Sequence, residues 1–239
     1  MSRKTASPPV TQLVFAAALT LTGVAHAQES KTPYARMAPI AQYLMTESAE
    51  IALAQSAAPA SISGDATIVV LKHNGYETAV QGKNGFVCIV ERSWMSPFDS
   101  PEFWNPKMRG PICFNPPAVR SILPFTTKRT EMILSGLSKT QIMERLKQEI
   151  LRKEVPTLEA GAMCYMMSRQ ANLGDSNGHW RPHLMFYGPR SDGADWGADR
   201  AGSPVMLNQQ FQNSPEPLTT YMVAVDRWSD GTSAPIHTQ

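Results

Sequence analysis

ATIVVLKHNGYETAVQGKNGFVCIVER, residues 66–92, carries the clearest secondary-structure signal in the chain. It opens with an apolar run that ends at Lys72, and Asn74-Gly75 then supplies a residue pair favoured in two-residue hairpin turns. Alternating residues lead to a second turn at Asn84-Gly85, after which residues 86–91 are strand-like again. The pattern predicts three strands in an antiparallel meander.

A helix is expected before this region, over about residues 39–57. Pro39 suits the first turn of a helix. At roughly 100° per residue, the apolar side chains on one helix face are Ile40, Tyr43, Leu44, Ile51 and Ala54. Glu47 falls in the middle of that face, and burying a carboxylate alone is costly. We interpret Glu47 as bound to a nearby arginine on a partly exposed helix, and the alternative is a functional carboxylate.

Further helices and strands follow. One helix is expected within residues 118–135, broken or started by Pro124, and a second over about residues 139–153, after a capping-box pattern at Ser138. The strand-like runs of the last third are residues 162–168, 183–187, 204–208 and 219–225. We therefore predict an α+β fold: a single domain over residues 28–239, with a largely antiparallel sheet of about seven strands and helices packed on it.

The first 27 residues have the pattern of a secretory signal peptide. Arg3 and Lys4 precede an apolar run over residues 13–24, and Ala25-His26-Ala27 fits an A-x-A cleavage site. The apolar run is too short for a membrane-spanning helix, which needs about 20 apolar residues. We expect residues 1–27 to be removed. The mature chain, without a transmembrane segment, is then expected to be exported to the periplasm or the extracellular space.

Removal of this segment also changes the charge of the protein. The chain of 239 residues has 22 basic and 20 acidic residues, and Arg3 and Lys4 are the two basic residues that are lost. The mature chain therefore carries 20 of each kind and no net charge. Nucleic-acid-binding proteins usually have a strongly basic face, so we expect no nucleic-acid partner, and anionic lipid surfaces are poor candidates as well.

All three cysteines, Cys88, Cys113 and Cys164, lie in the expected mature chain. An oxidising compartment allows one disulfide and leaves one thiol. We predict a Cys88–Cys113 bond, because it encloses a proline-rich segment without regular structure, and we predict Cys164 as a buried residue in a strand. The alternative for Cys164 is a nucleophile paired with His179 or His183, but no cysteine-protease signature surrounds it.

Aromatic residues mark the places where we expect a ligand to bind. Between residues 93 and 117 the periodicity is lost, and six prolines are interleaved with five aromatic residues, which indicates an ordered loop. All five tryptophans of the chain fall in or beside expected loops. The candidate ligand-binding residues are Trp94, Trp104, Trp180, Arg181 and Trp196. The alternative is that these aromatic residues only pack the loops against the sheet.

His179-Trp180-Arg181-Pro182-His183 is the densest cluster of chemically active residues. A histidine pair four residues apart on a helix would suit a metal, but the proline disfavours a helix. In an extended chain the two histidines lie about 13 Å apart, too far for one metal ion. A hydrolase, with or without the assistance of a metal, remains an alternative, with His179, His183 and an acidic partner such as Glu47 or Asp175.

Asp192, Asp195 and Asp199 form a second polar cluster, interleaved with glycines. Aspartate and glycine at this density favour tight turns, because the aspartate side chain bonds nearby backbone amides. Calcium ligands are the alternative, but the spacing D-x2-D-x3-D does not match an EF-hand loop. We expect turns here and no metal.

The chain lacks the stronger catalytic and cofactor-binding motifs, such as G-x-S-x-G, H-E-x-x-H, S-x-x-K, C-x-x-C and G-x-G-x-x-G, so no cofactor is predicted. The leading hypothesis is a ligand-binding or accessory protein of the cell envelope with an aromatic-lined cleft. Its partner would be a small molecule or an envelope component. The hydrolase described above and a structural envelope protein without a small ligand are the alternatives.

Overall fold

Eight strands form one mixed sheet in the part of the chain described by the structure, a computed structural model that covers residues 33–176, 178–209 and 213–234. Their order across the sheet is β2-β1-β3-β4-β5-β6-β8-β7, and all neighbouring pairs except β1–β3 are antiparallel. The strands are β1 (Thr67–Lys72), β2 (Gly75–Val80), β3 (Val87–Glu91), β4 (Gly110–Phe114), β5 (Met163–Met166), β6 (His183–Pro189), β7 (Val205–Leu207) and β8 (Leu218–Ala224). The predicted α+β fold with a largely antiparallel sheet is confirmed.

Five α-helices lie within the same described residues, together with three short 3-10 helices. The α-helices are α1 (Glu47–Gln55), α2 (Ala60–Ser63), α3 (Pro116–Ser121), α4 (Leu123–Leu134) and α5 (Lys139–Leu151). The 3-10 helices are η1 (Ile40–Gln42), η2 (Ser93–Met95) and η3 (Ala194–Trp196). The capping box at Ser138 that predicted the start of α5 is present, and Pro124 stands in the first turn of α4.

The hairpin at Asn74-Gly75 is confirmed, but the predicted meander is wrong in its third strand. β1 and β2 pair antiparallel, whereas β3 lies on the other side of β1 and runs parallel to it. β2 exposes Glu77 and Thr78 and so suits a sheet edge, while the centre of β3 is buried. The chain crosses the start of β1 at Gly82, where a Cβ would lie 2.2 Å from the backbone nitrogen of Thr67. A larger residue would block this crossing.

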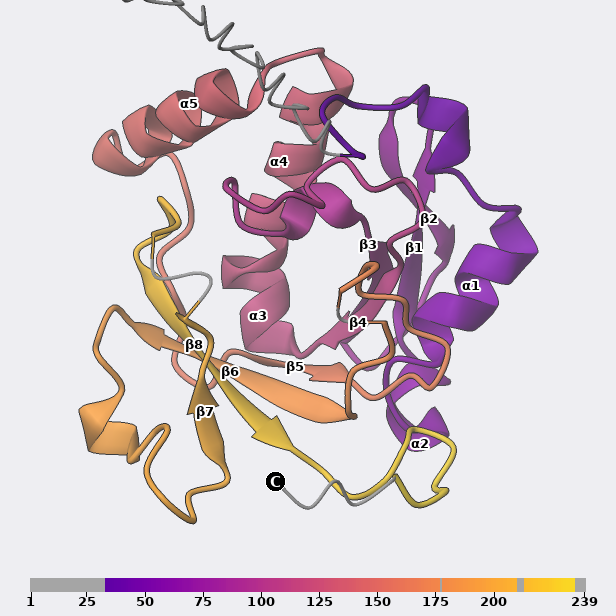
Figure 1. Cartoon of the computed structure of the whole chain (residues 1–239). Helices are drawn as coiled ribbons and strands as arrows, with labels where there is room; N and C mark the ends of the chain where they lie inside the picture. The colour runs from indigo at the N-terminus through magenta and orange to yellow at the C-terminus, as the bar shows by residue number, and fades with distance from the viewer. Residues whose placement is uncertain (1–32, 177, 210–212, 235–239) are drawn as a thin grey trace, which may run out of the picture. The chain divides into compact units, whose positions relative to one another are not determined.

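Helices cover both faces of the sheet, with α1 on one side of β1–β4 and α3 and α4 on the other (Figure 1). α1 shares an apolar cluster with Ile68, Val90 and the two bonded cysteines. The opposite cluster joins Ala118 of α3 to Ile89 and Ile112. Side chains alternate between the faces of a strand. The neighbouring β3 residues Ile89 and Val90 therefore pack in the two different clusters. Loops replace helices over part of the α3 side, and this part holds the site described below.

β4 lies inside the segment that was expected to lack regular structure. All five of its residues are buried, and Cys113 stands directly opposite Cys88 of β3. The two residues form the predicted disulfide, which therefore joins neighbouring strands. Cys164 is free and fully buried, as predicted, with its sulfur 3.2 Å from the Tyr187 hydroxyl. Burial raises the pKa of the Cys164 thiol, which disfavours the nucleophilic thiolate.

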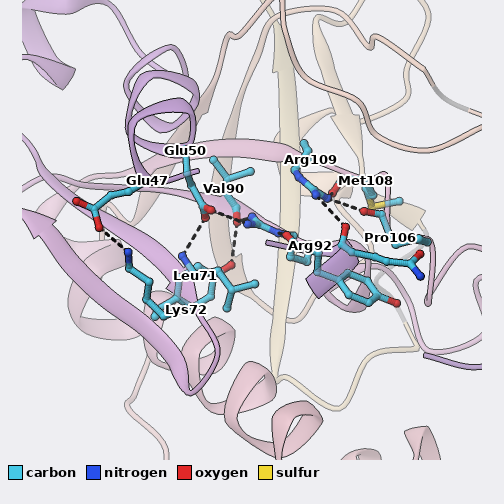
Figure 2. Close-up of polar contacts among 12 residues, drawn as sticks. Glu47, Glu50, Leu71, Lys72, Val90, Arg92, Pro106, Met108 and Arg109 are labelled. Atoms are coloured by element: carbon cyan, nitrogen blue, oxygen red, sulfur yellow. Dashed lines mark hydrogen bonds and ion pairs between the residues drawn. The ribbon is translucent and has the colours of Figure 1, made fainter. Parts of the chain in front are cut away.

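The first predicted helix is wrong in its bounds and in the partner of Glu47, which pairs with Lys72 and not with an arginine. The chain forms η1, turns at residues 43–46 and only then enters α1. The turn places Tyr43 in the core, where its hydroxyl donates to the carbonyl of Trp104 at 2.8 Å. Glu47 therefore begins α1 at the surface, in an ion pair with Lys72, and Glu50 takes the buried position (Figure 2).

Two predictions concern the ends of the chain and the membrane. The expected signal peptide, residues 1–27, lies outside the described residues. The described residues all belong to one compact unit. Within the described ranges, no helix has the length and apolar character needed to cross a membrane.

Candidate functional site

A cavity of about 390 Å³ opens at one end of the sheet, on the face that carries α3 and α4. The antiparallel register brings the end of β3, the start of β4, the end of β5 and the start of β6 to this same end. The loop after β3 and the loop before β6 form its walls. We call this cavity the methionine cleft, because its lining includes Met95, Met108, Met166, Met185 and Met222.

Strand register explains why these side chains meet. Met166 lies directly opposite His183, and Met185 lies directly opposite Met222 on the next strand. The positions alternate along β6, so His183 and Met185 share a face. Gly110 of β4 leaves that face open, since a Cβ there would lie 3.6 Å from the Met166 methyl group, 3.6 Å from Leu173 and 3.7 Å from the Glu91 Cβ. The glycine therefore contributes space to the floor of the cleft.

Glu91 is the carboxylate of the cleft floor. It ends β3 on the same face as Ile89, directly opposite Gly110. Its Oε1 accepts a hydrogen bond from the Thr126 hydroxyl at 3.3 Å, and Oε2 has no hydrogen-bond partner among the residues described. Burial among apolar side chains raises the pKa of Glu91 to about 7, although the Thr126 hydrogen bond and Arg129 oppose the shift. Glu91 therefore exchanges its proton near neutral pH.

His183 forms part of the cleft wall together with Trp180. The two rings meet edge to face, with centroids 4.5 Å apart. The Nδ1–H of His183 donates to the carbonyl oxygen of Arg181 at 2.8 Å, and burial lowers the pKa of His183 to about 4. The imidazole is therefore neutral at physiological pH, which leaves Nε2 as a hydrogen-bond acceptor. An apolar cleft with one acid and one neutral imidazole suits binding and proton exchange.

A second, smaller cavity of about 100 Å³ adjoins the methionine cleft. The two cavities share the lining residues Glu91, Met95, Met185 and Asn208. The smaller one is lined mainly by apolar side chains, namely Ile112, Phe114, Ile122, Phe125 and Leu218. Arg129 and Glu216 also reach it, and they form a buried ion pair of 2.6 Å. Glu91 thus stands at the junction of the two cavities.

Arg92, the residue after Glu91, is also part of the cleft lining, but its charge is already neutralised. Its guanidinium group forms a fully buried ion pair of 2.8 Å with Glu50, which also accepts the backbone N–H of Leu71 (Figure 2). Its remaining contacts are the carbonyl oxygens of Tyr43 and Val90. Arg92 therefore fixes the loop after β3 to α1.

Arg109 supports the segment that carries the cleft residue Met108. Its Nη1 donates to the carbonyl oxygens of Pro106 and Met108, each at 2.7 Å (Figure 2). Burial and the neighbouring charge of Arg92 together lower the pKa of Arg109 to about 10. The group is still cationic at physiological pH. These bonds keep Met108 beside the opening of the cleft.

The predicted tryptophan candidates do not converge. Trp180 lines the cleft, and Arg181 contributes its carbonyl group to the support of His183. Trp94 is fully buried, with its indole N–H bonded to Thr130, and Trp104 is 8% exposed. Both pack in the apolar cluster beneath the loop after β3, so packing accounts for their position.

Trp196 lies on the opposite face of the sheet from the cleft. It is 47% exposed, and its ring stacks on Tyr221 with centroids 4.2 Å apart. Tyr221 alternates with the cleft residue Met222 on β8, so the two side chains point to different faces. Trp196 therefore belongs to a separate aromatic surface.

The residues proposed for hydrolysis differ in burial and in their contacts. His179 is exposed and does not line the cleft, whereas His183 is buried in its wall. Asp175 accepts a hydrogen bond from the Tyr34 hydroxyl at 2.6 Å, and Glu47 pairs with Lys72. Across the described part of the chain, no group of three or more His, Cys, Asp or Glu residues is arranged to hold a metal ion.

Two of the three aspartates of the late loop, Asp192 and Asp199, accept backbone N–H groups. Asp192 accepts the N–H of Ala194 at 3.0 Å, and Asp199 accepts the N–H of Leu207 at 3.1 Å. Asp195 lies in the first turn of η3 and is exposed. Asp199 adopts a left-handed backbone conformation with φ of 57°, which aspartate tolerates better than most residues.

Glu91 and the methionines were missed by sequence reasoning. Strand alternation over residues 87–91 already places Glu91 beside two apolar residues on one face, so a signal for it was present. The methionines gave no such signal, since they are dispersed in five segments. The chain matches no protein-family model, no curated protein and no solved structure.

Proposed function

We propose that this chain is an exported ligand-binding protein and that the methionine cleft is its binding site. The observation that carries the proposal is the convergence of five methionines and Trp180 on one cavity with Glu91 at its floor. A volume of about 390 Å³ lies within the range of small-molecule pockets. Methionine side chains are flexible and polarisable, and they suit ligands with varied apolar shapes.

Export rests on two further observations, and a third bears on the partner. The basic start, the apolar run and the A-x-A site of residues 1–27 fit a signal peptide. The Cys88–Cys113 disulfide fits an oxidising compartment. A charge of zero after removal of Arg3 and Lys4 is unsuited to nucleic acid. A periplasmic or extracellular carrier or accessory protein is consistent with all three.

The cleft beside Trp180 favours ligand binding over a purely structural role. It also weakens the metal-assisted hydrolase hypothesis, because His179 is exposed outside the cleft and does not join His183 there. The acid of the cleft is Glu91, which shares the lining with His183 and the methionines but not with His179.

Nile red, a neutral dye whose fluorescence rises in apolar surroundings, tests the proposal. We expect saturable binding near one dye per protein. Gly110→Val should fill the cleft floor, and Trp180→Ala should remove part of its wall, so each should weaken dye binding about tenfold or more. Trp196→Ala is the matched control, since it removes an exposed tryptophan from the other face.

Circular dichroism must first show that the variants are folded. No saturable dye binding to the wild-type protein, or equal binding by Gly110→Val and Trp196→Ala, would remove the cleft as the site.

A further inference from the structure

The charge balance of the methionine cleft indicates which ligands it accepts. Among the described residues that line the cleft, the two charged ones are Glu91 and Arg92. Arg92 is paired with Glu50 and 1% exposed, so it offers no free positive charge. Glu91 has no ion-pair partner there and keeps Oε2 without a hydrogen bond. The cleft therefore has one uncompensated acidic group.

Arg129, which lines the adjoining cavity, also has its charge balanced by a carboxylate. Arg129 forms its ion pair with Glu216, and its Nη1 donates to the carbonyl oxygens of Trp94 and Ser96. Its guanidinium group also lies 4.4 Å from the Phe98 ring centre. These contacts hold Arg129 away from pairing with Glu91. An anionic ligand would meet Glu91 and would find the two lining arginines, Arg92 and Arg129, already paired with carboxylates.

A cationic ligand finds the opposite conditions. Its charge would restore the balance at Glu91, and its apolar body would contact the thioether groups and reach the smaller cavity beyond Glu91. Trp180 adds an indole ring, the aromatic group with the strongest attraction for cations. Ion pairs in such partly desolvated surroundings are less screened than at the protein surface.

We propose that the ligand of the methionine cleft is an apolar monocation, a molecule with an ammonium or quaternary ammonium group that faces Glu91 and an aliphatic or aromatic body. This inference rests on the proposed function and adds the chemical class of the ligand. It also predicts that binding strengthens as Glu91 loses its proton.

The groups around Glu91 permit this pH dependence to be assigned. Arg129 and Thr126 face it from α4, and Glu216, which precedes β8, is held by Arg129. His183 lies in the same cleft, and burial lowers its pKa to about 4. The other titratable neighbours, on β2, β5 and β6, have pKa values raised by burial: Tyr76, Cys164 and Tyr187. Among these groups with shifted pKa values, Glu91 is therefore the one that titrates between pH 5.5 and pH 8.5.

Three probes with the same chain length test the proposal: octyltrimethylammonium, octanol and octanoate, each below its micelle concentration. Calorimetric titration of the full chain at pH 8.5 should show the tightest binding for octyltrimethylammonium and the weakest for octanoate. With a pKa of about 7, Glu91 is about 3% ionised at pH 5.5 and about 97% ionised at pH 8.5. If only the ionised form binds the cation, its affinity should fall about 30-fold at pH 5.5.

Glu91→Gln should weaken octyltrimethylammonium binding at pH 8.5 and remove the pH dependence, with octanol affinity unchanged. Glu47→Gln, which changes a surface carboxylate, is the control and should behave as the wild type. Octanol or octanoate binding at least as tightly as the ammonium probe, or the same pH dependence in Glu91→Gln, would overturn the cation inference but leave the cleft as a binding site. If none of the three probes nor Nile red binds, the proposed function itself fails.

Discussion

The buried carboxyl group of Glu91 predicts an unusual pH dependence of stability. Burial holds its pKa at about 7 in the folded protein, against an ordinary value of 4.5. Between these values the folded state binds more protons than the unfolded state, so stability falls as the pH rises from about 4.5 to about 7 and then levels off. At roughly 1.4 kcal/mol per pKa unit, the full effect is about 3 kcal/mol. The part of Glu91 that faces the open cleft makes this an upper bound.

Replacement by glutamine isolates this contribution, because glutamine has the shape of the protonated acid and does not titrate. We expect Glu91→Gln and the wild type to have similar free energies of unfolding at pH 5. At pH 8 the variant should be the more stable protein by up to about 3 kcal/mol. Urea unfolding at several pH values, with the disulfide intact, measures the difference.

The contributions of the other titrating groups to the free energy of unfolding cancel in this comparison, since both proteins contain these groups. Glu47→Gln alters an exposed ion pair with Lys72 and should change stability by less than about 1 kcal/mol. A difference between wild type and Glu91→Gln that stays constant from pH 5 to pH 8 would refute the reasoning. Glu91 would then be ionised throughout this range and in contact with water.

Three further predictions concern the supporting structure. Arg92→Met leaves Glu50 buried without its cation and should lower the free energy of unfolding, measured with urea, by about 3–5 kcal/mol. A loss below about 1 kcal/mol would contradict the buried ion pair. Replacement of both Cys88 and Cys113 by serine opens a loop with a sequence separation of 25 and should cost about 3.5 kcal/mol, whereas unchanged stability would show that the bond adds no constraint. Cys164 should resist thiol reagents in the native protein at pH 8 and react after unfolding, and rapid native labelling would show that the thiol is accessible.

Elements with a short-range signal were predictable from the sequence. The Asn74-Gly75 turn and the Ser138 capping box depend on residues within a few positions of one another, and both are present. The start of α1 was not predictable in this way. Its position depends on Tyr43, which leaves the helical path to fill a core beside Trp94 and Trp104. Tertiary packing prevailed over the helical pattern of residues 39–57.

Long-range pairing explains the errors in the sheet. An antiparallel meander is the simplest result of two successive turns, but it would leave the apolar residues of β3 beside the polar edge strand β2. The placement of β3 next to β1 and β4 buries both faces of its centre. β4 itself has a proline at Pro111 and no alternation, because all of its residues are buried. Period-two patterns therefore could not reveal it.

The same cause hid the candidate site. Alternation along β3 marks Glu91 as an acid on an apolar face, but whether such an acid is solvated or enclosed depends on the strand opposite to it. That partner is Gly110, a residue of the unpredicted strand, and the glycine leaves room for Met166 and Leu173 to approach. A larger residue at position 110 would fill this space and close the floor of the cleft. The raised pKa and the binding space thus depend on one pairing of strands, so a variant that fills position 110 should change both together.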